Sequence, residues 1–355
     1  MYIFEEPPKK RGRRICLILF VLFLLFAVVP MSATVFLYNQ NFGSRSEIPA
    51  FSALLRYEDV EGYPRRLTSF YSGHNRLQAY IYGEENHKGL VVIAHGIGGG
   101  AESYFPEIMY FVDMGWRVFA FDKTGSHNSE GAGKRGLPQG LIDLNAALNY
   151  IALQGWNLPI MLFGHSWGGY AVTAVLNKDH NISAVVSLAG FDSPLGVMSE
   201  TARAYVGMNF AEIVARPYLR LYNWFVFGRY ANLSAVDGIN SGTVPVMIVH
   251  GTEDESIFYN GASIIAQRNR ITNPNAVFVS RSLPHNNGHN NLLRDAETAA
   301  FIDQINLEWR VIWESYGRNP PDQVRADFYA GIRERISALD REFMGEINRF
   351  FQRAL

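Results

Sequence analysis

The serine at position 166 and the glycines around it are the residues most suited to chemistry in this sequence. Residues 164–169 read GHSWGG, so Gly164, Ser166 and Gly168 match the pattern G-x-S-x-G. An apolar, strand-like segment precedes the motif and a helix-forming segment follows it. A nucleophilic serine can occupy a sharp strand-to-helix turn when small neighbours let the two elements approach each other. The sequence therefore predicts that Ser166 is a nucleophile, and the alternative is a serine that only closes a tight turn.

A serine hydroxyl needs a neighbouring base to take its proton and a carboxylate to orient that base. When the nucleophile is held in such a turn, the acid follows it along the chain and the histidine follows the acid. Asp254 lies in the segment HGTEDES, directly after the apolar residues 244–250. Because a loop at the carboxyl end of a strand can reach the base, we predict Asp254 as the acid. The alternatives are Glu253 beside it and Asp192, which follows the preceding strand.

The base is expected among the histidines that follow the predicted acid. His289 lies in the segment LPHNNGHNNLL, in the loop after the last predicted strand, and the glycine before it permits an exposed loop conformation. We predict His289 as the base, with His285 as the alternative. Three other histidines adjoin strands or the serine and are expected to pack or to shape loops: His95, His165 and His250.

The tetrahedral intermediate of such a reaction needs hydrogen-bond donors for its oxyanion. One predicted donor is the backbone amide of Trp167, the residue after the serine. The other is expected in the glycine-rich loop HGIGGG, at Ile97 or, as the alternative, at Gly98. This loop lacks the G-x-G-x-x-G spacing of dinucleotide sites and the lysine of a P-loop. We therefore interpret it as an oxyanion loop rather than a phosphate-binding loop.

These residues require strands whose carboxyl ends meet at one edge of a sheet. Short apolar segments alternate with helix-forming ones, and their continuous apolar character is typical of parallel strands buried on both faces. The predicted strands are residues 90–95, 117–122, 159–164, 184–190, 244–250 and 276–280. Residues 65–83 read as an antiparallel hairpin that leads into this sheet. The alternation predicts an α/β fold with a mostly parallel sheet and helices on both faces.

Residues 191–242 interrupt this alternation, because about fifty residues are too many for a simple crossover. The segment is rich in aromatic residues, among them Tyr218, Tyr222 and Trp224. We interpret it as a helical lid inserted over the carboxyl ends of the strands. The alternative is that ordinary helices pack there on the core. After residue 294 the chain is expected to be helical and to serve packing.

The N-terminus combines a basic segment with a long apolar one. Residues 1–14 end in the run KKRGRR, and residues 15–38 carry no charged side chain. As a helix, the apolar segment would span roughly 36 Å, more than the about 30 Å of a bilayer's hydrocarbon core. We predict an uncleaved transmembrane anchor and a polar connector at residues 39–56; a cleaved signal peptide and a soluble core helix are the alternatives. The positive-inside rule places the N-terminus in the cytoplasm and residues 57–355 outside it.

Composition excludes several other classes of function. Hydrophobic residues make up 48% of the 355 residues, which suffices for one large core, and a net charge of −1 gives no field that would attract nucleic acid. The only cysteine, Cys16, lies in the apolar N-terminal segment. A disulfide within one chain and a thiolate site in the rest of the chain are therefore excluded. No HExxH motif occurs, and we expect neither a metal nor another cofactor.

Five segments carry a family resemblance, in this order along the chain: HGIGGG, FDKTGSHNSEG, GHSWGG, HGTEDES and NNGHNN. Over about residues 57–293 the sequence resembles the α/β-hydrolase superfamily, in particular its serine-hydrolase branch of monoglyceride lipases and prolyl-aminopeptidase-like enzymes. The resemblance implies the α/β-hydrolase fold and the Ser-His-Asp triad predicted above. In the family an Arg-Gly turn usually follows the aspartate that ends the second strand, here Asp122. This chain has Lys123 and Thr124 at that point.

The predicted function is hydrolysis of an ester, or less readily an amide, by a membrane-anchored serine hydrolase through an acyl-enzyme intermediate. The aromatic residues of the predicted lid favour a small-molecule substrate with an apolar acyl or aryl group. Acyl transfer to an alcohol or amine would use the same triad. A non-catalytic, membrane-bound binding protein would keep the fold without the chemistry. An accessible pocket and a correctly placed His289 would favour the catalytic hypotheses over the binding hypothesis.

Overall fold

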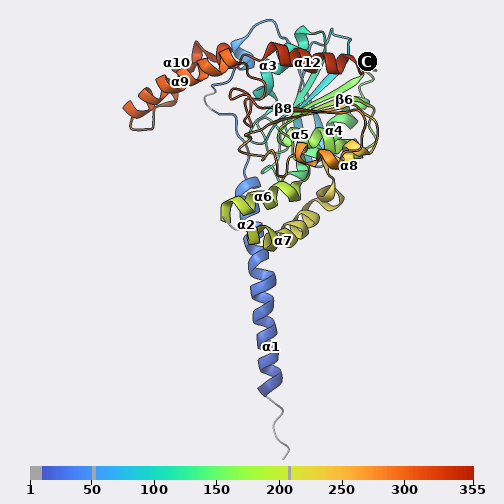
Figure 1. The fold of residues 1–355 in the computed structure, drawn as a ribbon, viewed down its shortest axis with the longest axis vertical. Helices are drawn as coiled ribbons and strands as arrows, with labels where there is room; N and C mark the ends of the chain where they lie inside the picture. The colour runs from blue at the N-terminus through green and yellow to red at the C-terminus, as the bar shows by residue number, and fades with distance from the viewer. Residues whose placement is uncertain (1–9, 50–52, 207–208) are drawn as a thin grey trace, which may run out of the picture.

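A computed structural model of the chain describes residues 10–49, 53–206 and 209–355. Residues 1–9 of the predicted basic segment, 50–52 of the predicted connector and 207–208 of the predicted insertion lie outside the described residues. The described chain forms a body around one sheet, and a long N-terminal helix extends away from that body (Figure 1).

In the part of the chain that the structure describes, eight strands form one sheet: β1 (Arg65–Ser72), β2 (Asn75–Tyr82), β3 (Leu90–Ala94), β4 (Arg117–Phe121), β5 (Ile160–His165), β6 (Ile182–Leu188), β7 (Val246–Gly251) and β8 (Ala276–Arg281). Their order across the sheet is β1-β2-β4-β3-β5-β6-β7-β8. β2 pairs antiparallel with β1 and with β4, and the remaining neighbours pair in parallel. The predicted hairpin, the predicted strands and the mostly parallel α/β sheet are confirmed.

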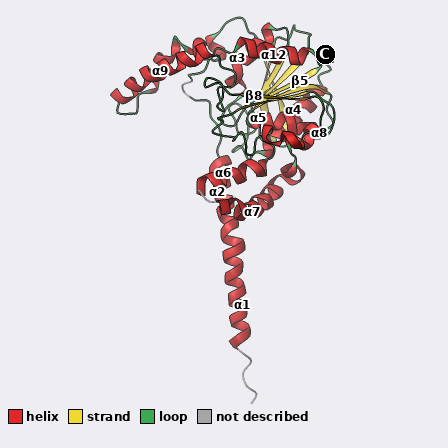
Figure 2. Cartoon of the chain, viewed as in Figure 1, coloured by secondary structure: helices red, strands yellow, loops and turns green. Residues whose placement is uncertain are grey.

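The central strands are apolar throughout because both of their faces are covered. Every residue of β3, β4 and β7 is buried, whereas the edge strands β1 and β8 expose several side chains. Continuous apolar runs are typical of parallel strands that have helices on both sides. The strands drawn in yellow in Figure 2 accordingly lie inside a shell of helices.

Successive residues of β3 point to opposite faces of the sheet and meet different helices. Val92 belongs to a core cluster with Leu144, whereas Val91 belongs to a second cluster with Phe111. The helices that contribute to the first cluster include α4 (Pro138–Ala152), α5 (Trp167–Ala174) and α8 (Ala235–Asn240). The helices that contribute to the second are α3 (Phe105–Asp113) and α12 (Arg341–Gln352).

The chain after residue 294 is helical, as predicted. It forms α9 (Ala296–Ser315), α10 (Asp322–Ala330), α11 (Arg333–Ile336) and α12. A small apolar cluster of its own, which includes Phe301, Ile305 and Tyr329, joins α9 to α10. These two helices reach sideways from the body (Figure 1).

The segment between β6 and β7 contains three helices that differ in what they pack against. α6 (Pro194–Val206) and α7 (Asn209–Phe227) stand off the sheet at the end of the body from which the N-terminal helix extends (Figure 1). α8 instead packs against α5, and its residues Ala235 and Ile239 are buried in the first core cluster. The part of the predicted insertion that stands off the sheet is therefore α6 and α7, although Val197 and Phe227 still reach the first core cluster.

The N-terminal helix is continuous through α1 (Lys10–Phe23), a π-helical turn η1 (Leu24–Val28) and α2 (Val29–Phe42). Its segment Gly12–Phe42 is long and apolar enough to cross a membrane, by length and composition. The helix continues to Phe42 rather than ending at residue 38 as the sequence predicted, and the Phe42 side chain is buried.

The first residues of the predicted connector lie on the surface of the body. The guanidinium of Arg45 donates hydrogen bonds to the carbonyl oxygens of His127, Ser129 and Gly131, at 2.7, 2.9 and 2.8 Å. The ammonium group of Lys134 donates to the carbonyl oxygen of Ser44 at 2.9 Å. The end of the N-terminal helix is therefore fixed against the body instead of being joined to it by a free linker.

Candidate active site

Ser166 lies in the turn between β5 and α5, in a backbone conformation that residues with a side chain rarely adopt. Its φ is 56° and its ψ is −114°. A Cβ on Gly164 would overlap the backbone of Gly168, and a Cβ on Gly168 would overlap the carbonyl group of Ala94. The two flanking glycines are thus required by the close approach of β5, α5 and β3.

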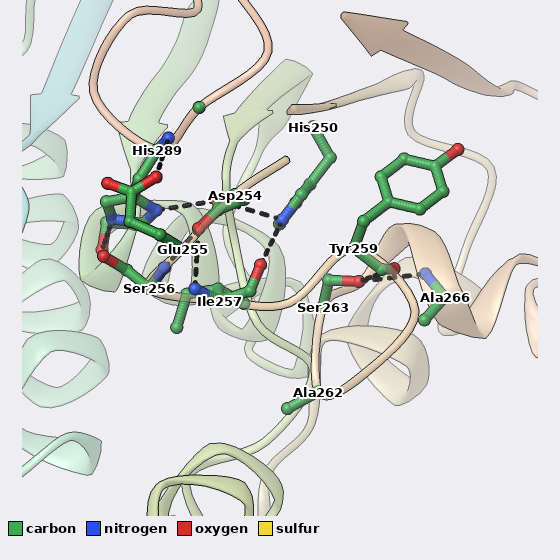
Figure 3. Close-up of polar contacts among 12 residues, drawn as sticks. His250, Asp254, Glu255, Ser256, Ile257, Tyr259, Ala262, Ser263, Ala266 and His289 are labelled. Atoms are coloured by element: carbon green, nitrogen blue, oxygen red, sulfur yellow. Dashed lines mark hydrogen bonds and ion pairs between the residues drawn. The ribbon is translucent and has the colours of Figure 1, made fainter. Parts of the chain in front are cut away.

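The structure brings the three predicted triad residues together from separate loops. The Nε2 atom of His289 lies 2.9 Å from Oγ of Ser166, and its Nδ1 atom lies 2.8 Å from Oδ2 of Asp254 (Figure 3). The relative exposures are 7% for Ser166, 6% for His289 and 3% for Asp254. Because Nδ1 faces a carboxylate, that nitrogen carries the proton and Nε2 is left to accept the serine's proton.

The carboxylate of Asp254 is held by both of its oxygens. Oδ1 accepts hydrogen bonds from the backbone amides of Ser256 and Ile257, at 2.9 and 2.7 Å. Oδ2 faces His289 and also lies 3.1 Å from Nε2 of His250. Burial alone would raise the pKa of the Asp254 carboxyl, but the hydrogen bonds from His250, His289 and the Ile257 amide hold this pKa well below its ordinary value.

His250 has a position that sequence reasoning did not give it. The prediction was that it shapes its loop, and its Nε2 does donate to the carbonyl oxygen of Ile257 at 2.8 Å. The same nitrogen also faces the carboxylate of Asp254, opposite His289 (Figure 3). The spacing of four residues between His250 and Asp254 was the available signal, since a strand end followed by a tight loop brings such a pair together.

The alternatives to the predicted triad lie elsewhere. Glu253 points into solvent. The Asp192 carboxylate accepts a hydrogen bond from the amide of Val236 at 3.0 Å and so helps to fix the start of α8. The imidazole that reaches both the serine and the acid is that of His289 rather than that of His285.

The predicted oxyanion donors flank the serine. Trp167 is the first residue of α5. Its side chain is buried, and its indole N–H donates to the carbonyl oxygen of Leu137 at 2.7 Å. Ile97 lies in the loop after β3, which passes close to the nucleophile: a Cβ on Gly96 would lie 3.5 Å from Cβ of Ser166. Gly98 in the same loop has a φ of 85°, which favours glycine.

A tyrosine and a histidine connect this loop to the triad. The hydroxyl of Tyr104 accepts a hydrogen bond from the amide of Gly96 at 3.0 Å and donates to Nδ1 of His165 at 2.7 Å. The Nε2–H of His165 in turn donates to the carbonyl oxygen of His289 at 2.9 Å. Burial and the neighbouring His289 lower the pKa of His165 to about 4, so this imidazole is neutral at pH 7. Nothing in the sequence around Tyr104 indicated this link.

Lys123 and Thr124, which stand where the family usually has an Arg-Gly turn, lie behind the oxyanion loop. The Lys123 ammonium donates to the carbonyl oxygen of His95 and lies 4.6 Å from the centre of the Trp167 ring. The backbone amide of Lys123 donates to Nε2 of His95 at 2.9 Å. Burial lowers the pKa of Lys123 to about 7. Thr124 donates through both its amide and its hydroxyl to the buried carboxylate of Asp143.

A large cavity opens at the nucleophile. Its volume is about 1650 Å³, which exceeds the usual range of about 300–1,000 Å³ for small-molecule pockets. Ser166, His289 and Ile97 line one end, and side chains of α2, α6 and α7 line another part. Within residues 10–49, 53–206 and 209–355, no group of three or more His, Cys, Asp or Glu side chains is placed to hold a metal ion.

Comparisons with known proteins agree with this architecture. Residues 85–222 match the family described as serine aminopeptidase, S33. An esterase from Pyrococcus furiosus is similar in structure, with 14% sequence identity and a TM-score of 0.52 over 76% of this chain and 95% of that one. The esterase Est1E from Butyrivibrio proteoclasticus, with ferulic acid bound, is 20% identical, with a TM-score of 0.50 over 68% of this chain and 98% of that one.

A comparison with curated protein sequences gives no match. The family match covers the oxyanion loop, the GHSWGG turn and most of α6 and α7. The structural matches have low sequence identity, which makes them evidence for the fold. The chain has the α/β-hydrolase fold, and the family match over residues 85–222 supports a serine hydrolase.

Proposed function

We propose that the chain is a membrane-anchored serine hydrolase that cleaves an ester of an apolar acyl group, with Ser166 as nucleophile, His289 as base and Asp254 as the acid that orients it. The observation that carries the proposal is the hydrogen-bonded series from Ser166 through His289 to Asp254 at the end of a large cavity. In this series each group already has the partner that its chemical role requires.

The reaction begins when Oγ of Ser166 attacks the ester carbonyl carbon while Nε2 of His289 takes the serine's proton. The carbonyl oxygen becomes an oxyanion that accepts hydrogen bonds from the amides of Ile97 and Trp167. The imidazolium of His289 is stabilised by the Asp254 carboxylate. Its proton passes to the leaving alcohol as the carbon–oxygen bond breaks, which leaves an acyl group on Ser166.

Water then completes the cycle. His289 takes a proton from water as the water oxygen attacks the acyl carbon, and the same two amides hold the second oxyanion. Collapse of this intermediate releases the carboxylic acid and returns the proton to Oγ of Ser166. Acceptance of the acyl group by an alcohol in place of water would give the acyl transfer alternative with the same residues.

The anchor is the N-terminal helix. Its apolar side chains from Ile15 to Val29 are mostly exposed, which suits a lipid environment rather than water. The basic residues before it favour a cytoplasmic N-terminus and a body on the other side of the membrane. The burial of Thr34, Tyr38 and Phe42 supports retention of the helix in the mature protein.

A fluorophosphonate, which phosphonylates activated serines, tests the proposal on the full-length protein in detergent. We expect one adduct on Ser166, located by mass spectrometry, and no adduct on Ser166→Ala. The matched control is Ser315→Ala on the outlying helix α9, which should label like wild type. Absence of labelling in a well-folded wild-type protein would contradict the proposal and favour the non-catalytic binding protein.

A further inference from the structure

One face of α2 forms a wall of the cavity that contains Ser166. The lining residues of this helix include Pro30, Ala33, Thr34, Leu37 and Asn41. They recur every three or four residues, so they lie along one side of the helix. The N-terminal helix therefore contributes to the substrate site as well as to anchoring.

This wall is fixed in position by the inserted helix α7. The hydroxyl of Tyr38 donates to Oδ1 of Asn223 at 2.9 Å, and both side chains are almost completely buried. The ring of Tyr38 meets that of Tyr222 edge to face, with centroids 4.8 Å apart. Further down the helix, the hydroxyl of Tyr218 donates to the carbonyl oxygen of Phe26. α2 and α7 are thus fixed to each other, and both line the cavity.

The length of the helix sets the depth of this unit in a membrane. With Arg14 at one surface, a hydrocarbon core of about 30 Å takes up about 20 helical residues. The second surface then falls near Thr34. Phe26, Pro30 and Ala33 lie on the hydrocarbon side of that surface, so the contact between α7 and Phe26 draws α7 into the bilayer as well.

The outer face of α7 has the composition expected for such a position. Ile213 and Phe225 are 70% and 81% exposed, and Leu221 and Trp224 are exposed as well. These residues recur at helical spacing on one side of α7, with the exposed Arg216 and Arg220 beside them. An exposed apolar stripe beside a transmembrane helix, with a tryptophan near its end, is typical of a surface that lies in a membrane interface.

We propose that α2, α6 and α7 form an acyl-chain site that opens into the bilayer, and that the substrate is an ester that resides in the membrane. This inference rests on the proposed function. The acyl chain moves from the lipid along the face of α2 that carries Ala33 and Leu37, and its carbonyl carbon reaches Ser166 without the chain crossing water. The apolar lining contributed by α6 and α7, including Val197, Met198 and Leu219, surrounds the chain.

The first test compares two esters of p-nitrophenol with the full-length protein in phosphatidylcholine vesicles. The palmitate partitions into the bilayer, and the acetate is water-soluble. Ala33→Trp, on the cavity face of α2, should lower the palmitate-to-acetate ratio of kcat/KM at least tenfold. Ser32→Trp, at an exposed position of the same helix that does not line the cavity, should change that ratio less than twofold.

Fluorophosphonate labelling counts the competent active sites of each variant, so a folding defect lowers labelling and is divided out of the rates. An unchanged ratio in Ala33→Trp, or an equal loss in both tryptophan variants, would overturn the role of α2. If the wild type neither labels nor hydrolyses the acetate, the proposed function itself fails. If the protein is labelled but Ala33→Trp leaves the palmitate-to-acetate ratio unchanged, only the present inference is refuted.

The second test asks what covers the outer face of α7. Phe225→Cys in a Cys16→Ser background is labelled with an environment-sensitive fluorophore, and lipids that carry a quencher in the acyl chain are added to the vesicles. We expect at least half of the emission to be quenched. The matched control Leu153→Cys, at an 84% exposed position after α4, should not be quenched. Emission from position 225 that ignores the lipid quencher would mean that water or another protein covers this face, and would overturn the proposal.

Discussion

The two ends of the cavity are built in different ways. At the nucleophile, Ser166, His289 and Asp254 are held by a dense set of hydrogen bonds from loops at the carboxyl ends of β5, β7 and β8. At the other end, apolar faces of α2, α6 and α7 form the walls, and the hydrogen bond between Tyr38 and Asn223 joins two of these helices. The first end is suited to moving protons and the second to holding an acyl chain.

This difference implies that chemistry and substrate choice can be changed separately. Substitutions at the polar end should lower the rate for short and long esters alike, because every ester passes through the same tetrahedral intermediate. Substitutions at the apolar end should change the preferred chain length. The following variants test that separation, beginning with the largest expected effect.

Asp254→Asn should lower kcat by about 10³–10⁴-fold on both short and long esters, because an amide cannot stabilise the imidazolium of His289 and favours the wrong tautomer. The exposed neighbour Glu253 supplies the matched control, and Glu253→Gln should remain within twofold of wild type. Steady-state kinetics with p-nitrophenyl acetate and palmitate measure both effects. A loss confined to the palmitate would contradict the assignment of Asp254 to the chemistry.

His250→Leu should lower kcat by about 10–100-fold with little change in KM, because Asp254 then loses one of the partners that orient its carboxylate. His250→Gln can still donate one N–H and should recover part of the loss, which separates positioning from general packing. His180→Leu, at a histidine that bonds to Asn145 away from the site, is the control. Equal rates for the leucine and glutamine variants would argue that His250 only fills space.

His165 should make the protein less stable in acid. Its pKa is about 4 in the folded state against 6.5 for an ordinary histidine. Between pH 6.5 and pH 4 the His165 imidazole is therefore protonated in the unfolded chain but largely neutral in the folded protein. The free energy of unfolding should fall by up to about 3 kcal/mol on acidification to pH 4 through this group alone, and it should be unaffected above pH 6.5.

Denaturant unfolding in detergent, compared between wild type and His165→Gln at pH 7 and pH 4, isolates this contribution. The variant has no titrating group at this position, so its loss of stability between the two pH values should be smaller. Parallel pH dependence of the two proteins would show that His165 does not have the lowered pKa that its burial beside His289 implies.

Tyr38→Phe tests the apolar end of the cavity and has the smallest expected effect. Removing the hydroxyl leaves the buried Oδ1 of Asn223 without its donor, which should lower the free energy of unfolding by about 1–2 kcal/mol. Tyr71→Phe on β1, where the side chain is exposed, should change it by less than about 0.5 kcal/mol. A neutral Tyr38→Phe would mean that α2 is not fixed to α7 in this way.

The polar end could be predicted from the sequence because its parts are local. GHSWGG, HGTEDES and NNGHNN each carry one residue next to a strand, and the chain order assigns the partners. The strands themselves were recognisable because β3, β4 and β7 are buried along their whole length.

The apolar end could not be predicted because it depends on contacts between distant segments. Tyr38 and Asn223 are 185 residues apart, and no local pattern relates them. The apolar character of residues 15–38 indicated a membrane helix, but it could not show that the last part of that helix enters the body. The link from Gly96 through Tyr104 and His165 to His289 was missed for the same reason.

The most direct test measures whether the enzyme hydrolyses an ester faster when the ester lies in the same bilayer as the protein. Vesicles that contain the full-length protein are given p-nitrophenyl palmitate either in the same bilayer or only in a second population of vesicles, with the Ser166→Ala protein as the blank. We predict hydrolysis at least tenfold faster when protein and ester share a bilayer, while p-nitrophenyl acetate in solution is cleaved equally in both arrangements. Equal rates for the palmitate in the two arrangements, once spontaneous exchange between vesicles is subtracted, would contradict an acyl site that opens into the membrane.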